Sequence, residues 1–520
     1  MSLTDRLPIL TLHVPANPLG RLRHLHWSVY ALAAVLVFAL VVRLILLTTV
    51  PVNVTADEAD NLQFIYRVLA GNGPSWSGLD WHQSPAFSLY TMSWFVDWFG
   101  DGVWGLRLYP ATLGTLTLIP FYVLARERLS VFASLLAAFL LATGLWFFHF
   151  SRTGYTNINS TFFATCTAAS LSLALRKDRW YYYAGVGLFA ALGLYGYDAG
   201  RPIGLAVAAF FPFALYFYRH NYRRVITGFF LAGIIASVLF IPQARTIFKD
   251  WDHFNTRTKA VSIFSVDTPY MGDTDRGAIL AHQVERNFKG FFLLDRSERE
   301  MSFQPDRLLP RGGIFLDFWT GMFFWVGLVA GLWRWRETSL WWCFFAVPLF
   351  VNEVFSINTP EATRSLVSTP FMYLFVGLGI ETTVALLRRP SGAVWLGFGV
   401  LAFVIAVTSV RGSFQWMEDP FSTQGRFLAL GLLALVFLLR GRAFVVPAAA
   451  MALVLFIAFA NLQGYFDWMH EPYVAAARGP SVELSEFNQW RACQIKQVKD
   501  GGFGFNVMQW EASRPACPGS

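Results

Sequence analysis

The chain has 520 residues, of which 55% are hydrophobic and only 14% are charged. Soluble domains carry about 25% charged residues, and disordered chains carry few apolar ones. The composition therefore excludes both classes and predicts a polytopic membrane protein. The net charge of +8 does not indicate nucleic acid as a partner, because basic residues of membrane proteins gather in their cytoplasmic loops.

Apolar windows recur along most of the chain. A helix needs about 20 mostly apolar residues to cross the hydrocarbon core, and the alternating segments of a membrane β-barrel are absent from the sequence. We therefore predict an all-α fold with about thirteen transmembrane helices. The windows are 29–49, 103–124, 131–149, 157–175, 181–197, 202–218, 225–241, 315–333, 339–356, 365–387, 393–410, 427–440 and 443–461.

Basic residues alternate between the loops and predict the orientation of the chain. If residues 1–28 are a cytoplasmic N-terminal segment, each inside loop holds at least two basic residues, as Arg126 and Arg128 do. Most short outside loops hold one, and the loop with Arg411 and Arg426 is the exception. This pattern follows the positive-inside rule. We expect an integral membrane protein whose transmembrane domain, 29–461, leads to an external C-terminus.

Three long segments then lie on the outer face. They are the acidic loop 50–102, in which we expect juxtamembrane helices, the long loop 242–314 and the small tail 462–520. The opposite face has only tight turns, and we find no internal repeat of the kind that transporters often show. Extramembrane mass on one side favours an enzyme that works at one membrane surface.

Three carboxylates follow the first predicted span. Asp57 and Asp60 would share one face of a helix, with Glu58 about 100° away. Acidic groups at a membrane boundary repel one another and lose hydration, so function is one reason to keep them. The alternative is a solvated helix start, with Thr55 as the N-cap. The cluster could also hold a divalent cation, because hard cations prefer carboxylate oxygens.

Further polar residues are predicted on the same face. His82 and Gln83 form a corner before Pro85, and Arg107 opens the second span, where it either meets an anion or extends to the lipid headgroups. Three more outside loops each bring an arginine to this face, and one also brings Tyr197. A set of guanidinium groups facing an acidic loop suits a lipid-borne phosphate with a hydroxylated remainder. The three arginines are Arg152, Arg201 and Arg364.

These motifs resemble those of a known superfamily. Asp57-Glu58, the Ser84-Pro85 corner, Arg107-Leu108-Tyr109-Pro110, Ser151-Arg152 and Thr363-Arg364-Ser365 stand in the order seen in GT-C glycosyltransferases. The branch is that of protein O-mannosyltransferases and aminoarabinose transferases, similar to glycosyltransferase family 39. Its Lys-Pro-Pro corner is here Gln83-Ser84-Pro85, and an Asp found in some members is here Asn157 or Asn159. A WWDxW-type motif is absent, which argues against an oligosaccharyltransferase.

The resemblance implies a function. It implies inverting transfer of a hexose or pentose from a polyprenyl-phosphate donor to a hydroxyl of a protein, lipid or glycan, at the outer face of a bacterial or archaeal plasma membrane, with no required cofactor. Asp57 would be the general base, and Glu58 would position the acceptor or the sugar. Cations would stabilise the leaving phosphate. The expected substrate contacts are Asp60, His82, Gln83, Arg107, Arg152, Tyr197, Arg201 and Arg364.

Two rival interpretations remain. A transporter or flippase of a lipid-linked sugar would need polar residues at mid-membrane depth, and most of the predicted spans lack them. A membrane scaffold or receptor without catalysis is the third interpretation.

In an oxidising compartment the tail cysteines Cys493 and Cys517 could form a disulfide.

Overall fold

The computed structural model describes most of the chain between residues 26 and 470. The described ranges are 26–51, 56–81, 83–100, 102–265, 275–288, 315–357, 359–388, 420–439 and 444–470, together with residues 291, 391, 395, 397, 399 and 442. Several expectations fall outside these ranges: His82, Thr55, both tail cysteines and most of the predicted span 393–410.

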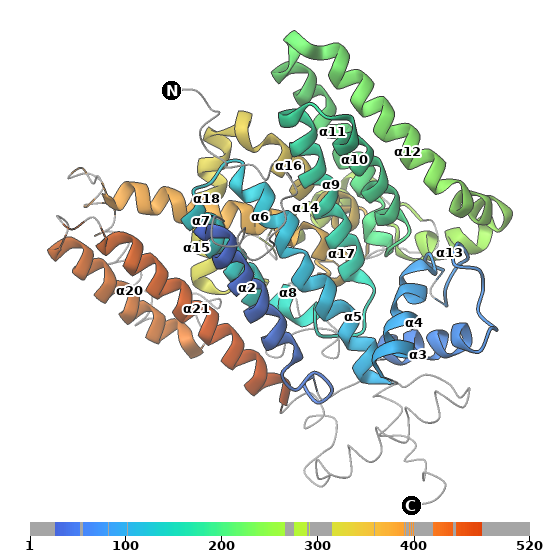
Figure 1. Ribbon diagram of the computed structural model, residues 1–520, viewed down its shortest axis with the longest axis horizontal. Coiled ribbons are helices and arrows are strands. Elements are labelled where there is room, and N and C mark those ends of the chain that lie inside the picture. The colour runs from blue at the N-terminus through green and yellow to red at the C-terminus, as the bar shows by residue number, and fades with distance from the viewer. Residues whose placement is uncertain are drawn as a thin grey trace, which may run out of the picture.

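The described chain is helical throughout, and its first half forms one array of antiparallel and crossing helices (Figure 1). Its helices are α2 (Trp27–Leu44), α3 (Ala56–Leu69), α4 (Phe87–Phe99), α5 (Val103–Leu116), α6 (Leu118–Arg126), α7 (Val131–Thr143), α8 (Leu145–Phe150), α9 (Asn157–Lys177), α10 (Trp180–Leu194), α11 (Pro202–Phe217) and α12 (Tyr222–Lys249). A short 3₁₀ turn, η2 (Asp198–Gly200), precedes α11.

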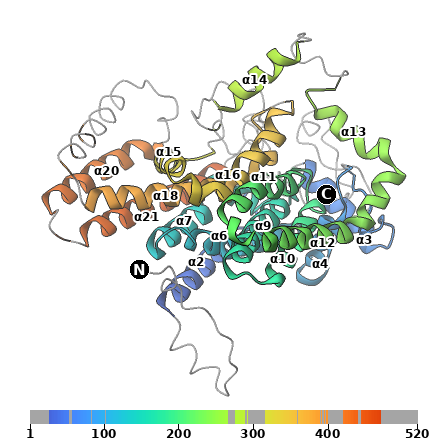
Figure 2. The same cartoon turned by 90° about the horizontal axis from the view of Figure 1, so that it is seen from above.

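The second half adds two polar helices and a further set of mostly apolar ones. Its elements are α13 (Trp251–Val261), α14 (Arg276–Phe288), α15 (Phe318–Trp333), α16 (Trp335–Leu349), the π-helical turn η6 (Phe350–Val354), α17 (Ala362–Ser365), the 3₁₀ turn η7 (Leu366–Ser368), α18 (Thr369–Arg388), α20 (Pro420–Leu438) and α21 (Val445–His470). Seen from above, α13 and α14 stand apart from the main array (Figure 2). Extended pairing within the described residues is limited to isolated bridges such as Ser262 with Ser356.

The expected all-α membrane fold is confirmed. Seven helical segments of the described chain are long and apolar enough to cross a membrane, and Val131–Thr143, Phe318–Trp333 and Gln424–Leu438 are shorter apolar helices. Helices occupy the other predicted windows, and 393–410 lies mostly outside the described residues, so the count of thirteen stays a prediction. Loop 50–102 holds α3 and α4, as expected, and loop 242–314 holds α13 and α14. The helix α12 continues past residue 242 to Lys249.

Local sequence accounts for several helix ends. Ser130 starts α7 by accepting a hydrogen bond from the backbone N–H of Ala133, and Asp317 starts α15 by accepting from Thr320. These side chains satisfy backbone donors that a helix start leaves unpaired. Arg334, between α15 and α16, forms an ion pair with Glu337 in the first turn of α16. Short polar turns of this kind separate long apolar helices.

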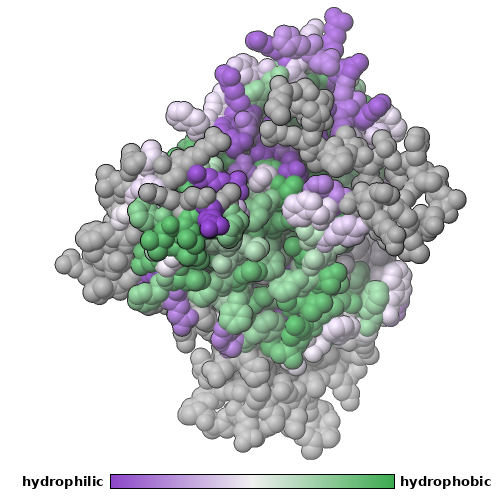
Figure 3. Space-filling view, turned by 60° about the vertical axis from the view of Figure 1, so that its left-hand side comes forward, coloured by the Kyte–Doolittle hydropathy of each residue, from purple (hydrophilic) through white to green (hydrophobic). Residues whose placement is uncertain are grey.

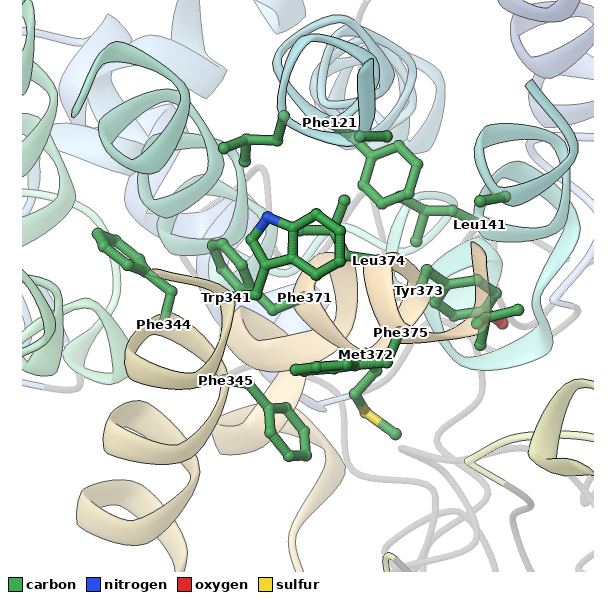
Figure 4. Packing of buried hydrophobic residues seen from close by; sticks show 14 of the residues in the cluster. Phe121, Leu141, Trp341, Phe344, Phe345, Phe371, Met372, Tyr373, Leu374 and Phe375 are labelled. Carbon is green, nitrogen blue, oxygen red and sulfur yellow. The ribbon is translucent and has the colours of Figure 1, made fainter. Parts of the chain in front are cut away.

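Aromatic side chains from α6, α16 and α18 fill the centre of the array. Figure 4 shows Phe121 of α6 and Leu141 of α7 facing Trp341 of α16 and the run from Phe371 to Phe375 on α18. Glycines bring α15 and α18 into backbone contact: a Cβ at Gly327 would lie only 1.7 Å from the carbonyl oxygen of Phe375. Small residues allow this close approach of membrane helices.

The outside of the array is apolar. Figure 3 shows a broad hydrophobic surface with hydrophilic residues gathered above it. Large apolar side chains are exposed on several helices, such as Val37 of α2, Phe427 and Leu438 of α20 and Phe230 of α12. Such a surface is stable in contact with lipid rather than water, because lipid tails are as apolar as leucine. The sequence-based expectation of membrane insertion is therefore supported by the fold.

Candidate active site

A polar pocket lies where several membrane helices begin or end. Helix α2 ends shortly before α3, α10 ends at Leu194, and α9 and α17 begin at Asn157 and Ala362. The segments at these ends meet and enclose the pocket. Its described lining residues are Asp57, Asn61, Asp80, Trp81, Ser84, Tyr155, Thr156, Asn157, Tyr197, Glu361, Thr363 and Arg364.

Three of the predicted site residues meet in this pocket. Asp57, from the first turn of α3, Tyr197, from the turn after α10, and Arg364, from α17, all line it. They stand far apart in the sequence. The structure thus brings a carboxylate and a guanidinium to one polar cavity, as the prediction of an acidic loop facing a cation requires.

Glu58 lies beside Asp57 but faces the protein interior. Its two carboxylate oxygens accept from Nε of Arg107 at 2.9 Å and from Nη2 of Arg107 at 3.0 Å. The backbone N–H of Gly154 donates to Glu58 at 2.7 Å. Both charged side chains are fully buried, and neither lines the pocket. A buried charge needs such a complete set of partners.

The remaining donors of Arg107 hold the segment between α2 and α3. Its Nη1 donates to the carbonyl oxygens of Leu47 and Pro51, at 3.1 and 2.9 Å. This segment sets where α3 starts. Arg107 and Glu58 therefore fix the position of Asp57, and the geometry offers no direct contact of Arg107 with a ligand in the pocket.

Arg152 is likewise used within the protein. It is fully buried, and its two terminal nitrogens donate to four carbonyl oxygens at and beyond the end of α2, those of Val42, Arg43, Ile45 and Val50. The last carbonyls of a helix lack partners within the helix. Arg152 thus closes the end of α2, and it does not line the pocket.

Arg364 is the cation of the pocket. Its Nη1 donates to the carbonyl oxygen of Ile357 at 2.8 Å. The carbonyl oxygen of Arg364 accepts from Nδ2 of Asn352 at 3.1 Å, and the same nitrogen donates to Ala199 at 3.1 Å. Asn352 lies in the π-helical turn η6 and so joins α17, which lines the pocket, to η2, which directly follows the lining residue Tyr197.

Neighbouring side chains hold the start of α17. The Glu361 carboxylate caps it by accepting from the backbone N–H of Thr363 at 3.5 Å, and it also accepts from the hydroxyl of Thr363 at 2.8 Å. The backbone N–H of Glu361 donates to Glu353 at 2.8 Å. Nδ2 of Asn157 donates to the carbonyl oxygen of Thr363 at 2.9 Å. The backbone that carries Arg364 is therefore fixed from three directions.

Arg201 and Gln83 lie outside the lining. Arg201 donates to Asp198 at 2.7 Å and stacks over Phe254 of α13, so it joins η2 to the long loop. Asp198 in turn accepts from the hydroxyl of Ser84 at 2.9 Å, which anchors the Ser84-Pro85 corner. Gln83, next to this corner, has a positive φ of 62°.

Asp60 lies one turn after Asp57 and is half-buried. Burial, followed by repulsion from Asp57, raises the pKa of Asp60 to about 6. Glu58 points away from both, toward Arg107. The described residues contain no group of three or more His, Cys, Asp or Glu side chains able to hold a metal ion. The three acidic residues are thus not gathered as a ligand set.

The sequence analysis missed Arg43, Tyr155 and Glu361. Arg43 lies within α2, is fully buried and donates to the carbonyl oxygen of Ala39, while its guanidinium stacks over Phe148. An arginine inside an apolar window was the available signal. Tyr155 and Glu361 line the pocket but carried no motif by which to find them.

The fold has counterparts among solved structures. The structure superposes on the crystal structure of ArnT from Cupriavidus metallidurans bound to undecaprenyl phosphate with a TM-score of 0.51 at 15% identity, covering 84% of this chain and 77% of that chain. The helical fold of this chain is thus similar to that of ArnT. The oligosaccharyltransferase AglB from Archaeoglobus fulgidus, in complex with an inhibitory peptide and a dolichol-phosphate, is less similar, with a TM-score of 0.47, 13% identity and coverage of 89% and 59%.

One segment of the sequence also matches a family model. Residues 83–245 match the family model described as dolichyl-phosphate-mannose-protein mannosyltransferase. The Pmt1-Pmt2 complex of S. cerevisiae, bound to the sugar donor, has a TM-score of 0.37 at 17% identity and covers 47% of this chain and 36% of that chain. No curated protein sequence matched the chain. This match covers less than a third of the chain and agrees with the predicted resemblance to family 39-like glycosyltransferases.

Proposed function

We propose that this integral membrane protein is an inverting glycosyltransferase that takes a sugar from a polyprenyl-phosphate donor and transfers it to an acceptor hydroxyl. The observation that carries the proposal is the presence of Asp57 and Arg364 in one polar pocket at the helix ends. The matched family model and the ArnT structure, both named for lipid-phosphate ligands, support this class of donor.

The chemistry assigns different roles to the two charged groups. Asp57 accepts the proton of the acceptor hydroxyl, whose oxygen forms the new bond to the anomeric carbon as the bond to the phosphate oxygen breaks. The lipid phosphate leaves with the bonding electrons, and Arg364 stabilises its charge. A phosphate is a good leaving group, so the pocket needs a cation there more than a general acid.

The other predicted site residues act in support of these two. Tyr197, which lines the pocket, contacts the sugar or acceptor, while Asp60 acts on Asp57 through its charge. Glu58, Arg107 and Arg152 hold the backbone, and Arg201 joins η2 to α13. The reaction takes place on the outer face of a bacterial or archaeal plasma membrane, and the protein has a cytoplasmic N-terminus and an external C-terminus. The acceptor is a protein, lipid or glycan hydroxyl.

Reconstituted protein tests the proposal. The purified chain is placed in liposomes with radiolabelled polyprenyl-phosphate hexoses and pentoses and a panel of acceptors. We expect transfer of one sugar with inversion at the anomeric carbon and release of polyprenyl phosphate. Correctly folded protein that binds none of the donors, or that moves them across the bilayer without cleaving them, contradicts the proposal.

A further inference from the structure

A second, apolar slot lies on the opposite side of the molecule from the polar pocket. It runs between α15 and α18 on one side and α20 and α21 on the other, helices that lie to the left in Figure 1, whereas α3 lies to the right. The two cavities share no described lining residue. The slot is lined by Trp319, Met322, Phe323, Val326, Ile380, Thr383, Val384, Leu387, Arg426, Ala429, Leu430, Leu432, Leu433, Val436, Val446, Ala449, Ala450 and Leu453.

The slot exists because α20 is held away from α15 and α18. Helix α20 packs chiefly on α21, and α21 in turn contacts α18 and α7, whereas α15 and α18 pack tightly on each other. Gly425 of α20 approaches Trp319, so α20 and α15 meet near one end of the slot. Beyond that contact, the pair α15 and α18 separates from the pair α20 and α21, and the slot lies between the apolar faces of the two pairs.

The size and chemistry of the slot say what can fill it. Its volume is about 190 Å³. That is roughly ten times what a single water needs, and water does not fill a cavity of this kind because almost all of its lining is apolar and offers few hydrogen-bond partners. An empty slot would forfeit dispersion contacts along its whole lining. Within a membrane, a hydrocarbon chain is the occupant that restores those contacts.

One end of the slot carries a positive charge. Arg426 is the one charged side chain among the described lining residues, and it is nearly buried, stacked over Phe318. The indole N–H of Trp319, which also lines the slot, is buried with no hydrogen-bond partner. From Arg426 to Val436 the helix rises about 15 Å. The slot therefore matches an amphiphile with an anionic head at one end and a chain along its length.

We propose that the slot binds one acyl chain of an anionic membrane phospholipid, with Arg426 at the headgroup phosphate. A guanidinium matches phosphate oxygens with its planar set of donors. The site is separate from the pocket with Asp57 and does not depend on the function proposed for that pocket. The bound lipid fills the space between the two helix pairs and fastens α20 and α21 to the rest of the array.

The test uses phosphatidylglycerol with a photoactivatable acyl chain in liposomes. After irradiation, we expect adducts on the lining segments of α20 and α21 when peptides are mapped by mass spectrometry. Arg426→Gln should lower this labelling roughly fivefold, the loss expected when one basic side chain near an anionic lipid is neutralised. Ala450→Trp, which fills the slot, should lower it as well. Matched controls are Arg388→Gln and Val329→Trp, at exposed positions outside the slot.

Competition identifies the lipid. Unlabelled phosphatidylglycerol should displace the probe, whereas phosphatidylcholine should displace it several times less well. Equal competition by the two lipids would overturn the headgroup contact, and preferential displacement by polyprenyl phosphate would assign the slot to the donor instead. Labelling that avoids α20 and α21 in the wild-type protein would overturn the site. Because these outcomes use the unmodified chain, they hold even if Ala450→Trp fails to fold.

Discussion

Glu58 and Arg107 form a fully buried ion pair in which both carboxylate oxygens accept from the guanidinium. Asp57, the adjacent residue, lines the polar pocket instead. Two neighbouring acidic residues thus have opposite surroundings, one inside the protein and one at a cavity. This difference separates a residue that holds the site from one that can react in it, and it can be tested by substitution.

Replacing Asp57 by Asn should abolish transfer and leave the fold intact. The amide cannot take up the acceptor's proton, and loss of a general base costs at least about a hundredfold in rate. Turnover of a saturating donor, together with a thermal unfolding curve in detergent, checks both parts. Asp97→Asn is the matched control, because Asp97 is exposed on α4 and does not line the pocket. Normal turnover by the Asp57 variant would remove the base assignment.

Replacing Glu58 by Gln should act on stability rather than chemistry. Removal of one partner leaves the charge of Arg107 buried and unpaired, which typically costs about 3 to 5 kcal/mol. The expected result is a clearly lower unfolding temperature. Glu337→Gln is the control, since its partly exposed pair with Arg334 should contribute no more than about 1 kcal/mol. Equal unfolding temperatures for wild type and Glu58→Gln would contradict the structural role.

Replacing Arg364 by Gln should weaken binding of the donor's phosphate. A hydrogen bond to a charged group contributes about 1.5 to 3 kcal/mol, so affinity for polyprenyl phosphate should fall at least roughly tenfold. The affinity is measured by titrating a fluorescently labelled polyprenyl phosphate into detergent-solubilised protein. Arg201→Gln serves as the comparison, because Arg201 lies outside the lining and binds Asp198. If Arg201 matters more than Arg364, the phosphate site lies elsewhere.

Asn352 should affect the same ligand from a distance. Its side-chain nitrogen joins the carbonyl oxygens of Ala199 and Arg364, and each of these hydrogen bonds contributes about 1 kcal/mol. We expect Asn352→Ala to lower donor affinity several-fold even at temperatures where the protein is fully folded. A lower unfolding temperature with unchanged affinity would assign Asn352 a purely structural role.

Asp60 gives a pH-dependent prediction. Its pKa in the folded protein, raised to about 6, exceeds the ordinary value of 3.8, so the folded state binds this proton more tightly than the unfolded state. Stability from Asp60 therefore falls as pH rises between about 4 and 6, and the cost is fully present at pH 7. Asp60→Asn should raise the unfolding temperature at pH 7.5 and change it little near pH 4. A difference that is larger at acidic pH would contradict the sign.

The membrane class, the helical architecture and the resemblance to GT-C enzymes could all be predicted from the sequence. Each is a property of local patterns: an apolar window such as 29–49 must become a helix in lipid, since no other local structure satisfies its backbone there. The acidic motif at Asp57 and the loop arginine Arg364 were predicted for the same reason. Both lie at the ends of predicted spans, where a polar side chain can reach water and so avoids the cost of burial in the hydrocarbon core.

The partners of each charged group were decided only by the tertiary structure. Asp57 and Glu58 are neighbours in the sequence, and Arg107, Arg152 and Arg364 all look like boundary arginines. Which of them meets a carboxylate, a row of carbonyl oxygens or a cavity depends on how α3, α5 and α17 pack, at separations of tens to hundreds of residues. Burial and pairing arise from that packing, and no local pattern records them.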